Sequence, residues 1–233
     1  MVAPAGKQVQ SMFGEIAERY DFLNGFLSFG IDRLWRRRAI KGAAVSASDK
    51  VLDLCCGTGD LAIAFAKEGC QTTGADFTYQ MLSKAPPKAD KNKVSVDWVQ
   101  ADAQQLPFTD DSFDVVSIAF GIRNVENAEL AIQECHRVLK EGGRLVVLEF
   151  FPIPNPVWRF LFRLYFLRVL PVIAAVVRAG RTGAYTYLPQ SVDEFYTANA
   201  FAKLLTSSEF KLLSDTALTG GVSRLFVAVK KSQ

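Results

Sequence analysis

Short apolar runs alternate with segments of helical periodicity from Val51 onward. The apolar runs are too short for buried helices and rich in β-branched residues, which is typical of buried strands. Strands are expected over residues 51–55, 71–75, 94–99, 113–119 and 144–150, and helices over 60–66 and 126–139. We expect the sequence Glu141-Gly142-Gly143 to stop the second helix. This alternation predicts a parallel sheet with helices on both faces.

The last part of the chain breaks the alternation. A helix is expected over 191–208, followed by strands over 210–218 and 222–229 that are separated by Thr219-Gly220-Gly221. Strands so close in sequence pair antiparallel, because a parallel pair needs a long crossover. The predicted fold class is therefore α/β: a doubly wound, Rossmann-like mixed sheet, mostly parallel, with a C-terminal antiparallel hairpin.

Two segments lie outside the expected sheet. Residues 11–44 have the pattern of two helices broken near Gly30, and residues 151–180 are apolar but contain four arginines. We divide the chain into an N-terminal helical lid (1–45), a cofactor-binding α/β core (46–150), an apolar helical insertion (151–190), and a C-terminal helix with the hairpin that completes the sheet (191–233).

Composition and charge exclude several classes of protein. The 233 residues are 49% apolar and 22% charged, and the net charge of +3 is too small to indicate a nucleic-acid partner. The four cysteines lack metal-ligand spacing, so we expect no metal and reduced thiols, which suits a reducing compartment. We expect neither a signal peptide nor a membrane-spanning helix, which favours a cytoplasmic protein.

A glycine-rich loop follows the first expected strand, with Gly57 and Gly59 allowing a tight turn and close approach of a ligand. The same glycines fit a dinucleotide fingerprint, which alone is a weak signal. Asp53 distinguishes a dinucleotide from S-adenosyl-L-methionine as the ligand of this loop. A carboxylate at this position repels a pyrophosphate but attracts the sulfonium and ammonium groups of S-adenosyl-L-methionine. We therefore expect S-adenosyl-L-methionine as the cofactor.

Aspartates also follow the next two strands. Asp76 is placed to accept the ribose hydroxyls, and Asp102 is placed to meet the adenine amino group. Each alone could be a loop aspartate that caps a helix. Three acids at the carboxyl ends of successive strands, where such sheets bind ligands, favour a nucleoside cofactor.

Several stretches together resemble the ubiquinone/menaquinone biosynthesis C-methyltransferases, a family of class I S-adenosylmethionine-dependent methyltransferases. They are MFGEIAERYDFLN at 12–24, SFG at 28–30, LW at 34–35, VLDLCCGTGD at 51–60, LPF at 106–108, FGIRN at 120–124, RVLKEGGRLVVLE at 137–149, YTYL at 185–188 and TGG at 219–221. The resemblance runs from about residue 12 to the C-terminus. It implies cofactor contacts at Thr58, Asp76, Asp102 and Ala103, although the family usually has Asn where Asp102 stands.

The resemblance also implies catalytic or substrate roles for Arg123 and Asn124, which follow the fourth strand. Methylating a ring carbon of a quinol requires an electron-rich ring, so a developing phenolate needs a cation or donor beside it. Arg123 stays protonated, so it could stabilise the phenolate or orient a water, and Asn124 could donate a hydrogen bond. The alternative is an arginine paired with an acid and an asparagine that caps the following helix.

Other polar residues are interpreted from their positions. Tyr20, Asp21 and Asn24 form a polar cluster on the lid and are expected to bind substrate. His136, the only histidine, lies inside a helix away from the strand ends and is expected to be structural. We read the neighbouring Cys55 and Cys56 as small buried residues. Trp35 with the three arginines after it is interpreted as a solvated basic face.

The resulting hypothesis is a C-methyltransferase that acts on a polyprenylated demethyl-quinol of respiratory quinone biosynthesis. A methyltransferase of another amphipathic acceptor, such as a phospholipid amine or a sterol, is an alternative, as is a non-catalytic cofactor-binding subunit of a quinone-synthesis complex. The apolar residues from Trp158 to Leu167 are expected to receive the tail and lie on the inner-membrane surface, with Arg159, Arg163 and Arg168 reaching headgroups. An insertion that only covers the core is the alternative, and a homodimer is compatible with either.

Overall fold

The computed structural model describes residues 30–165 and 184–231, together with residues 11, 13, 14, 17, 28 and 168. Its centre is one seven-stranded sheet with the strand order β3-β2-β1-β4-β5-β7-β6. The strands are β1 (Lys50–Leu54), β2 (Gln71–Asp76), β3 (Asp97–Gln100), β4 (Phe113–Ala119), β5 (Leu139–Phe150), β6 (Phe210–Leu218) and β7 (Ser223–Lys230). Strands β1 to β5 are parallel, and β7 pairs antiparallel with both β5 and β6, which confirms the predicted mixed sheet.

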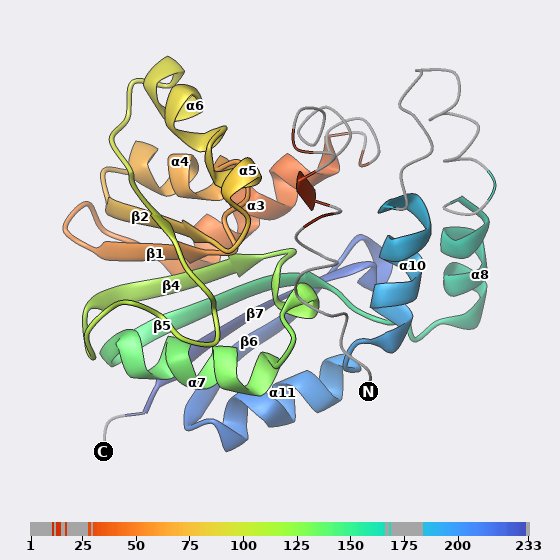
Figure 1. Cartoon of the computed structure of the whole chain (residues 1–233). Helices are drawn as coiled ribbons and strands as arrows, with labels where there is room; N and C mark the ends of the chain where they lie inside the picture. The colour runs from red at the N-terminus through yellow and green to blue at the C-terminus, as the bar shows by residue number, and fades with distance from the viewer. Residues whose placement is uncertain are drawn as a thin grey trace.

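Helices cover both faces of this sheet (Figure 1). They are α3 (Ile31–Ala43), α4 (Asp60–Lys67), α5 (Tyr79–Leu82), α6 (Ala85–Lys91), the 3₁₀ turn η1 (Ile122–Asn124), α7 (Ala128–Val138), α8 (Pro156–Leu164), α10 (Ala184–Glu194), α11 (Ala198–Ser207) and the 3₁₀ turn η3 (Thr219–Gly221). One buried cluster joins α7 and α11 to the sheet, and a second joins α3 and α4 to the opposite face. This is the two-sided packing that a parallel sheet requires.

The junction between α7 and β5 differs from the expectation. The glycines at 142 and 143 do not stop the helix, because α7 ends at Val138 and β5 begins at once with Leu139. The register with β4 jumps from Phe113↔Leu139 to Val115↔Arg144, so residues 140–143 form a bulge inside the strand. Gly142 has a φ of 71°, which explains why glycine suits this bulge.

Three smaller expectations are also corrected. The helix expected over 191–208 is two helices, because Thr197 caps α11 by accepting a hydrogen bond from the Ala200 amide. The third strand starts at Asp97 rather than at Val94. Trp35 is not on a solvated face: it is buried, and its ring packs against Phe120 and Phe150. Its neighbour Arg36 pairs with Asp32, while the two arginines that follow are exposed.

The segment predicted as a lid is divided by the structure. Its second half is α3, which packs on the sheet through Ala39 and Ala43 and belongs to the core layers. Most of its first half, with Tyr20, Asp21 and Asn24, lies outside the described residues.

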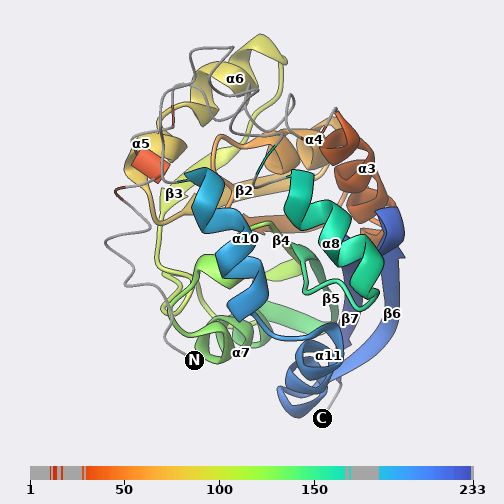
Figure 2. The same cartoon turned by 90° about the vertical axis from the view of Figure 1, so that its right-hand side faces the viewer.

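Within the predicted insertion, α8 and α10 lie beside each other beyond the carboxyl ends of β4 and β5 (Figures 1 and 2). In the described part of the chain, no helix is long and apolar enough to cross a membrane.

Candidate functional site

A cavity opens at the carboxyl ends of the parallel strands, where open α/β sheets bind their ligands. The space within its outline is about 850 Å³, part of which is open to solvent. Its described lining comes from the ends of β1, β2 and β4, the segments after β1, β2, β3 and β4, and the N-terminal segment. The residues are Phe13, Leu54, Cys55, Gly57, Asp76, Phe77, Thr78, Met81, Ala101, Asp102, Ala103, Gln104, Ala119, Phe120, Gly121, Asn124, Val125 and Glu126.

The loop between β1 and α4 forms one wall, and its glycines have two physical causes. Gly59 has a φ of 84°, and a Cβ there would lie 2.5 Å from the ring of Trp98. A Cβ on Gly74 of β2 would lie 2.4 Å from the same ring. The two glycines therefore make room for Trp98, which packs behind the loop, while Gly57 at a φ of 59° lines the cavity.

The end of β4 meets this loop just as closely. A Cβ on Gly121 would lie 2.3 Å from the Cβ of Cys55, so this position accepts only glycine without a backbone shift. Cys55 and Phe120 have φ values of 56° and 59°, a conformation that is costly for residues with a side chain. Both strands therefore end at the cavity in a strained backbone conformation.

Asp76 lies at the end of β2 with both carboxylate oxygens directed at backbone amides. Oδ2 accepts from the Gly57 amide and Oδ1 from the Thr78 amide, each at 2.8 Å. Burial raises the pKa of Asp76, and these two hydrogen bonds oppose the shift. Each oxygen keeps a further lone pair, so the residue can accept a pair of ligand hydroxyls while it fixes the glycine loop.

Asp102 and Ala103 also line the cavity, after β3. The Asp102 carboxylate accepts from the backbone amide of Gln104 at 2.9 Å and from the side-chain amide of the same residue. Four residues that the sequence analysis predicted as cofactor contacts therefore line this cavity: Gly57, Asp76, Asp102 and Ala103.

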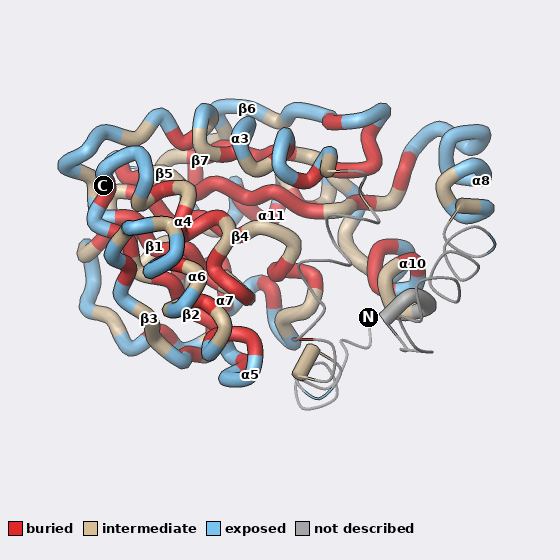
Figure 3. Tube along the Cα trace, turned by 90° about the horizontal axis from the view of Figure 1, so that it is seen from above, coloured by how far each residue is buried: buried red, intermediate tan, exposed pale blue. Residues whose placement is uncertain are grey.

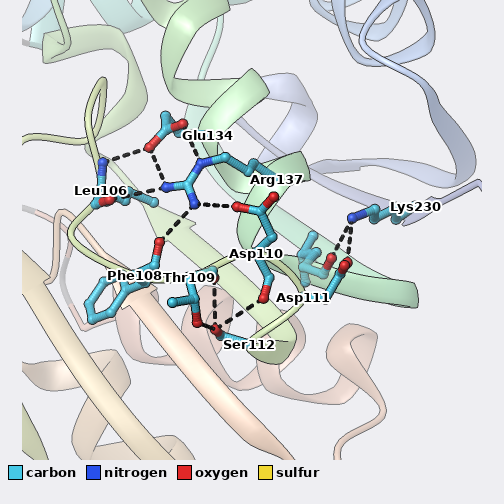
Figure 4. A network of polar contacts seen from close by, with 10 residues as sticks. Leu106, Phe108, Thr109, Asp110, Asp111, Ser112, Glu134, Arg137 and Lys230 are labelled. Carbon is cyan, nitrogen blue, oxygen red and sulfur yellow. Dashed lines mark hydrogen bonds and ion pairs between the residues drawn. The ribbon is translucent and has the colours of Figure 1, made fainter.

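A polar network around Arg137 of α7 holds the connection that follows these residues (Figure 4). The Arg137 guanidinium donates to the carbonyls of Leu106 and Phe108 at 3.0 and 2.7 Å, and pairs with Glu134 and Asp110. Glu134 in turn accepts from the Leu106 amide at 2.7 Å. The chain that leaves the cavity wall is thus tied to the helix that precedes β5.

Three predicted cofactor residues lie outside the lining. Thr58 is buried, and its hydroxyl accepts from Lys88 Nζ at 3.2 Å. Gly59 packs against Trp98 as described. Asp53 is only 1% exposed on the α3 and α4 side of the sheet, where Ser117 donates to its Oδ1 at 2.7 Å.

The other oxygen of Asp53 has no hydrogen-bond partner in the described part of the chain. Burial raises the pKa of Asp53 to about 7, although the Ser117 hydrogen bond and the charge of Arg36 lower it. Asp53 is therefore buried behind the glycine loop and does not line the cavity.

Arg123 is likewise turned away from the cavity. Its Nη1 pairs with Glu149 Oε1 at 2.5 Å and donates to the Phe120 carbonyl at 3.3 Å, while Nε donates to Ser191 Oγ at 3.1 Å. Glu149 is fully buried, and burial raises its pKa while the charge of Arg123 lowers it. The structure therefore has the second alternative considered for Arg123, an arginine paired with an acid.

Asn124 does line the cavity, and its side chain is held from two sides. Tyr187 of α10 donates its hydroxyl to Oδ1 at 2.8 Å, and Nδ2 donates to the Phe120 carbonyl at 3.3 Å. Sequence reasoning missed Glu149 and Tyr187 as site residues, although both lie in stretches that carried the family resemblance. No sequence pattern indicated Tyr187, because its contact with Asn124 depends on the packing of α10.

The remaining candidates keep structural roles. The His136 ring packs edge-on against Phe210 at 5.2 Å, far from the cavity wall, and its Nε2 is buried without a partner in the described residues. All four cysteines are free. Burial raises the pKa of the Cys55 thiol well above its usual value, so this lining residue is neutral and not a nucleophile. Phe226 is a core residue packed on Phe151 and Phe201.

The donor set fits S-adenosyl-L-methionine. Half-buried and buried carboxylates follow β2 and β3, and the Gly57 backbone, with no Cβ in the way, faces the same space. Carboxylates suit hydroxyls, amino groups and positive charge, and they disfavour the pyrophosphate of a dinucleotide. Asp76, Asp102 and Ala103 would hold the nucleoside part.

Solved structures share this fold. The [4+2]-cyclase SpnF superimposes with a TM-score of 0.75 over 100% of this chain and 98% of its own, at 18% identity. A putative methyltransferase from Bacillus halodurans gives a TM-score of 0.65 over 84% of this chain and 99% of its own, at 21% identity. Since one of these is a cyclase, the fold alone does not define the reaction.

Fold and cavity together define a class I methyltransferase fold with a nucleoside-cofactor site. The sequence profile of the ubiE/COQ5 methyltransferase family matches residues 1–230, and the chain belongs to this family of S-adenosylmethionine-dependent methyltransferases. A demethylmenaquinone methyltransferase of Thermus thermophilus is 45% identical over 93% of this chain and 98% of its own. A ubiquinone/menaquinone biosynthesis C-methyltransferase of a Geobacter species is 41% identical over 97% of each chain.

Proposed function

We propose that the protein methylates a ring carbon of a polyprenylated demethyl-quinol: demethylmenaquinol, the corresponding ubiquinol precursor, or both. The names of its relatives point to this class of acceptor. The observation that carries the proposal is the division of the cavity. The carboxylates of Asp76 and Asp102 line the part after β2 and β3, whereas the part after β4 is lined mainly by apolar residues, with one amide, Asn124, and one carboxylate, Glu126.

The chain's own groups have distinct tasks in this reaction. When bound, S-adenosyl-L-methionine supplies the methyl group. Asp76 and the Gly57 loop hold the nucleoside side, and the Asn124 amide donates to a quinol oxygen, which favours the electron-rich ring that a carbon nucleophile needs. Arg123 positions Asn124 indirectly, because its ion pair with Glu149 fixes the η1 turn that carries Asn124.

A methyl-transfer assay tests the proposal. The protein should convert a short-tailed demethyl-naphthoquinol or demethyl-benzoquinol into a product that is heavier by one CH₂, because the methyl group replaces a ring hydrogen that leaves as a proton. Mass spectrometry detects this product. Phosphatidylethanolamine and a sterol, offered under the same conditions, should stay unchanged. Methylation of one of those lipids in place of the quinols would favour the alternative acceptor, and no transfer to any of them would favour a non-catalytic subunit.

We also propose that the N-terminal segment covers the site, with Tyr20, Asp21 and Asn24 on its substrate side. Phe13, from this segment, already lines the cavity. Excluding water strengthens electrostatic interactions in a site, which is a common task of lids. Deletion of residues 1–27 should abolish turnover while the circular dichroism of the sheet and helices persists, and full activity of the truncated chain would contradict the lid.

The exposed surface of α8 supports a further part of the proposal, contact with a membrane. Val157, Phe160, Leu161 and Leu164 repeat at helical spacing along one side, and the first two are 68% and 65% exposed. Figure 3 shows that α8 is largely exposed, whereas the strands of the sheet are largely buried. We propose that this apolar stripe lies on the lipid surface from which a long-tailed quinol must be taken.

Two arginines of α8 have partners within the protein. Arg159 Nε donates to the Ile153 carbonyl at 2.7 Å, and Arg163 pairs with Asp193 of α10 at 3.4 Å. Both contacts link α8 to neighbouring segments, and the Arg163 side chain is 54% exposed. The helix is amphipathic, not apolar all round, and its apolar stripe is what faces away.

A further inference from the structure

Helix α10 contacts the turn after β4 through two polar side chains on one face. Tyr187 donates to Asn124 Oδ1 at 2.8 Å, and Ser191, one turn later, accepts from Arg123 Nε at 3.1 Å. Residues four apart share a helix face, so the two contacts dock α10 in one rotation about its axis. The Ser191 hydroxyl also donates to the Leu188 carbonyl at 3.0 Å, so its proton is directed away from the arginine.

The hydrogen bonds determine how the Asn124 amide is oriented. The Phe120 carbonyl can only accept, so the amide nitrogen must be the atom that faces it. The amide oxygen then faces Tyr187, whose hydroxyl must donate. One N–H of Asn124 remains without a partner among the described residues, and this side chain lines the cavity.

We propose that Tyr187 is a positioning residue for methyl transfer: its hydroxyl fixes the Asn124 carboxamide so that the remaining N–H is presented to the acceptor oxygen. This inference rests on the proposed quinol acceptor. Burial raises the pKa of Tyr187, so the phenol keeps its proton and stays a donor throughout the neutral range. Without it, the amide oxygen loses a partner and the carboxamide can rotate.

The variant Tyr187→Phe removes the hydroxyl and keeps the ring. We expect kcat to fall on the order of 10- to 100-fold, since small misplacements of a reacting partner cost factors of this size. The affinity for S-adenosyl-L-methionine, measured by calorimetry, should not change. The matched control is Tyr196→Phe. The Tyr196 hydroxyl lies 3.5 Å from Glu129 and outside the cavity lining, so its loss should leave kcat unchanged.

A double-mutant cycle separates positioning from independent action. If Tyr187 acts through Asn124, adding Tyr187→Phe to Asn124→Ala should change kcat/KM by less than about twofold. Losses that multiply in full would show that the two residues act independently, and wild-type kcat in Tyr187→Phe would show that the hydroxyl is dispensable. Either result overturns the inference.

A second readout needs no methyl transfer. Binding of the demethyl-quinol to the protein without methyl donor, measured by equilibrium dialysis, should weaken in Tyr187→Phe and in Asn124→Ala to a similar extent, but not in Tyr196→Phe. Failure of the wild type to methylate or bind any quinol would refute the proposed function itself. Normal quinol binding and turnover in Tyr187→Phe would refute only the role of Tyr187.

Discussion

At the scale of single residues, the least expected group is the carboxyl of Asp53, which is almost fully buried with one oxygen unpartnered in the described structure. Because the folded state raises its pKa from 3.8 to about 7, the folded chain binds this proton more tightly than the unfolded chain. The stability supplied by that proton is fully present below the unfolded pKa and is lost as the pH rises through about 7.

Asp53→Asn removes this titration. The free energy of unfolding of the wild type, relative to that of Asp53→Asn, should fall by about 2 kcal/mol between about pH 5 and about pH 8. Urea unfolding of both proteins at the two pH values measures this. Asp215→Asn, in the ion pair with Arg224, is the control and should run parallel to the wild type. Parallel curves for wild type and Asp53→Asn would contradict a raised pKa.

The buried pair of Arg123 and Glu149 gives a second residue-scale prediction. Arg123→Met leaves the Glu149 carboxylate buried without its partner, and such losses cost roughly 3–5 kcal/mol. The double variant Arg123→Met/Glu149→Met removes both charges and should recover much of this, because an apolar pair has no desolvation cost. Chemical unfolding of the three proteins makes the comparison. A double variant as unstable as the single one would show that the pair itself, not the orphaned charge, sets the stability.

At the scale of elements, the sequence predicted the types of structure well and their ends less well. The apolar runs of β1 and β4 were unambiguous, because strands covered on both faces have few polar positions. The break between α10 and α11 was missed because apolar residues continue through Phe195 and Tyr196, which pack against Phe201 in place of continuing a helix. The bulge in β5 was missed because Gly142-Gly143 is also a typical helix stop.

The apolar stripe on α8 gives the element-scale prediction. Phe160→Glu combined with Leu164→Lys should abolish flotation of the protein with anionic phospholipid vesicles, since it places two charges on the surface that would enter the lipid. The fold should persist, because no residue of α8 is buried. Leu213→Glu is the matched control: this leucine of β6 is 55% exposed, and its change should leave flotation as in the wild type.

Two outcomes would contradict membrane contact by α8. One is a wild type that stays at the bottom of the gradient while it turns over long-tailed quinol delivered in detergent. The other is a double variant that floats as well as the wild type. The first would leave the stripe as a surface for the tail alone.

At the scale of the whole molecule, the sequence located the site but not which side chains face it. The order of strands and the acids at their ends placed Asp76 and Asp102 at one edge of the sheet, as found. Successive side chains of a strand point to opposite faces, but β1 is buried on both, so no polar pattern showed which way Asp53 points. Tyr187 reaches Asn124 from 63 residues away, a contact that only the packing of α10 creates.

The cavity draws on three strand ends at once, so binding of S-adenosyl-L-methionine there should stabilise the whole domain. At S-adenosyl-L-methionine concentrations about 100 times the Kd, linkage adds about 2.7 kcal/mol. For a chain of this size, this corresponds to a rise of roughly 5–10 °C in Tm by differential scanning fluorimetry.

Asp76→Asn keeps one oxygen that can accept from a backbone amide but loses the charge and one acceptor. Most of the rise in Tm should therefore vanish at the same ligand concentration. Asp215→Asn should keep the full rise. A full rise in Asp76→Asn would remove Asp76 from the cofactor site and move the nucleoside to another part of the cavity.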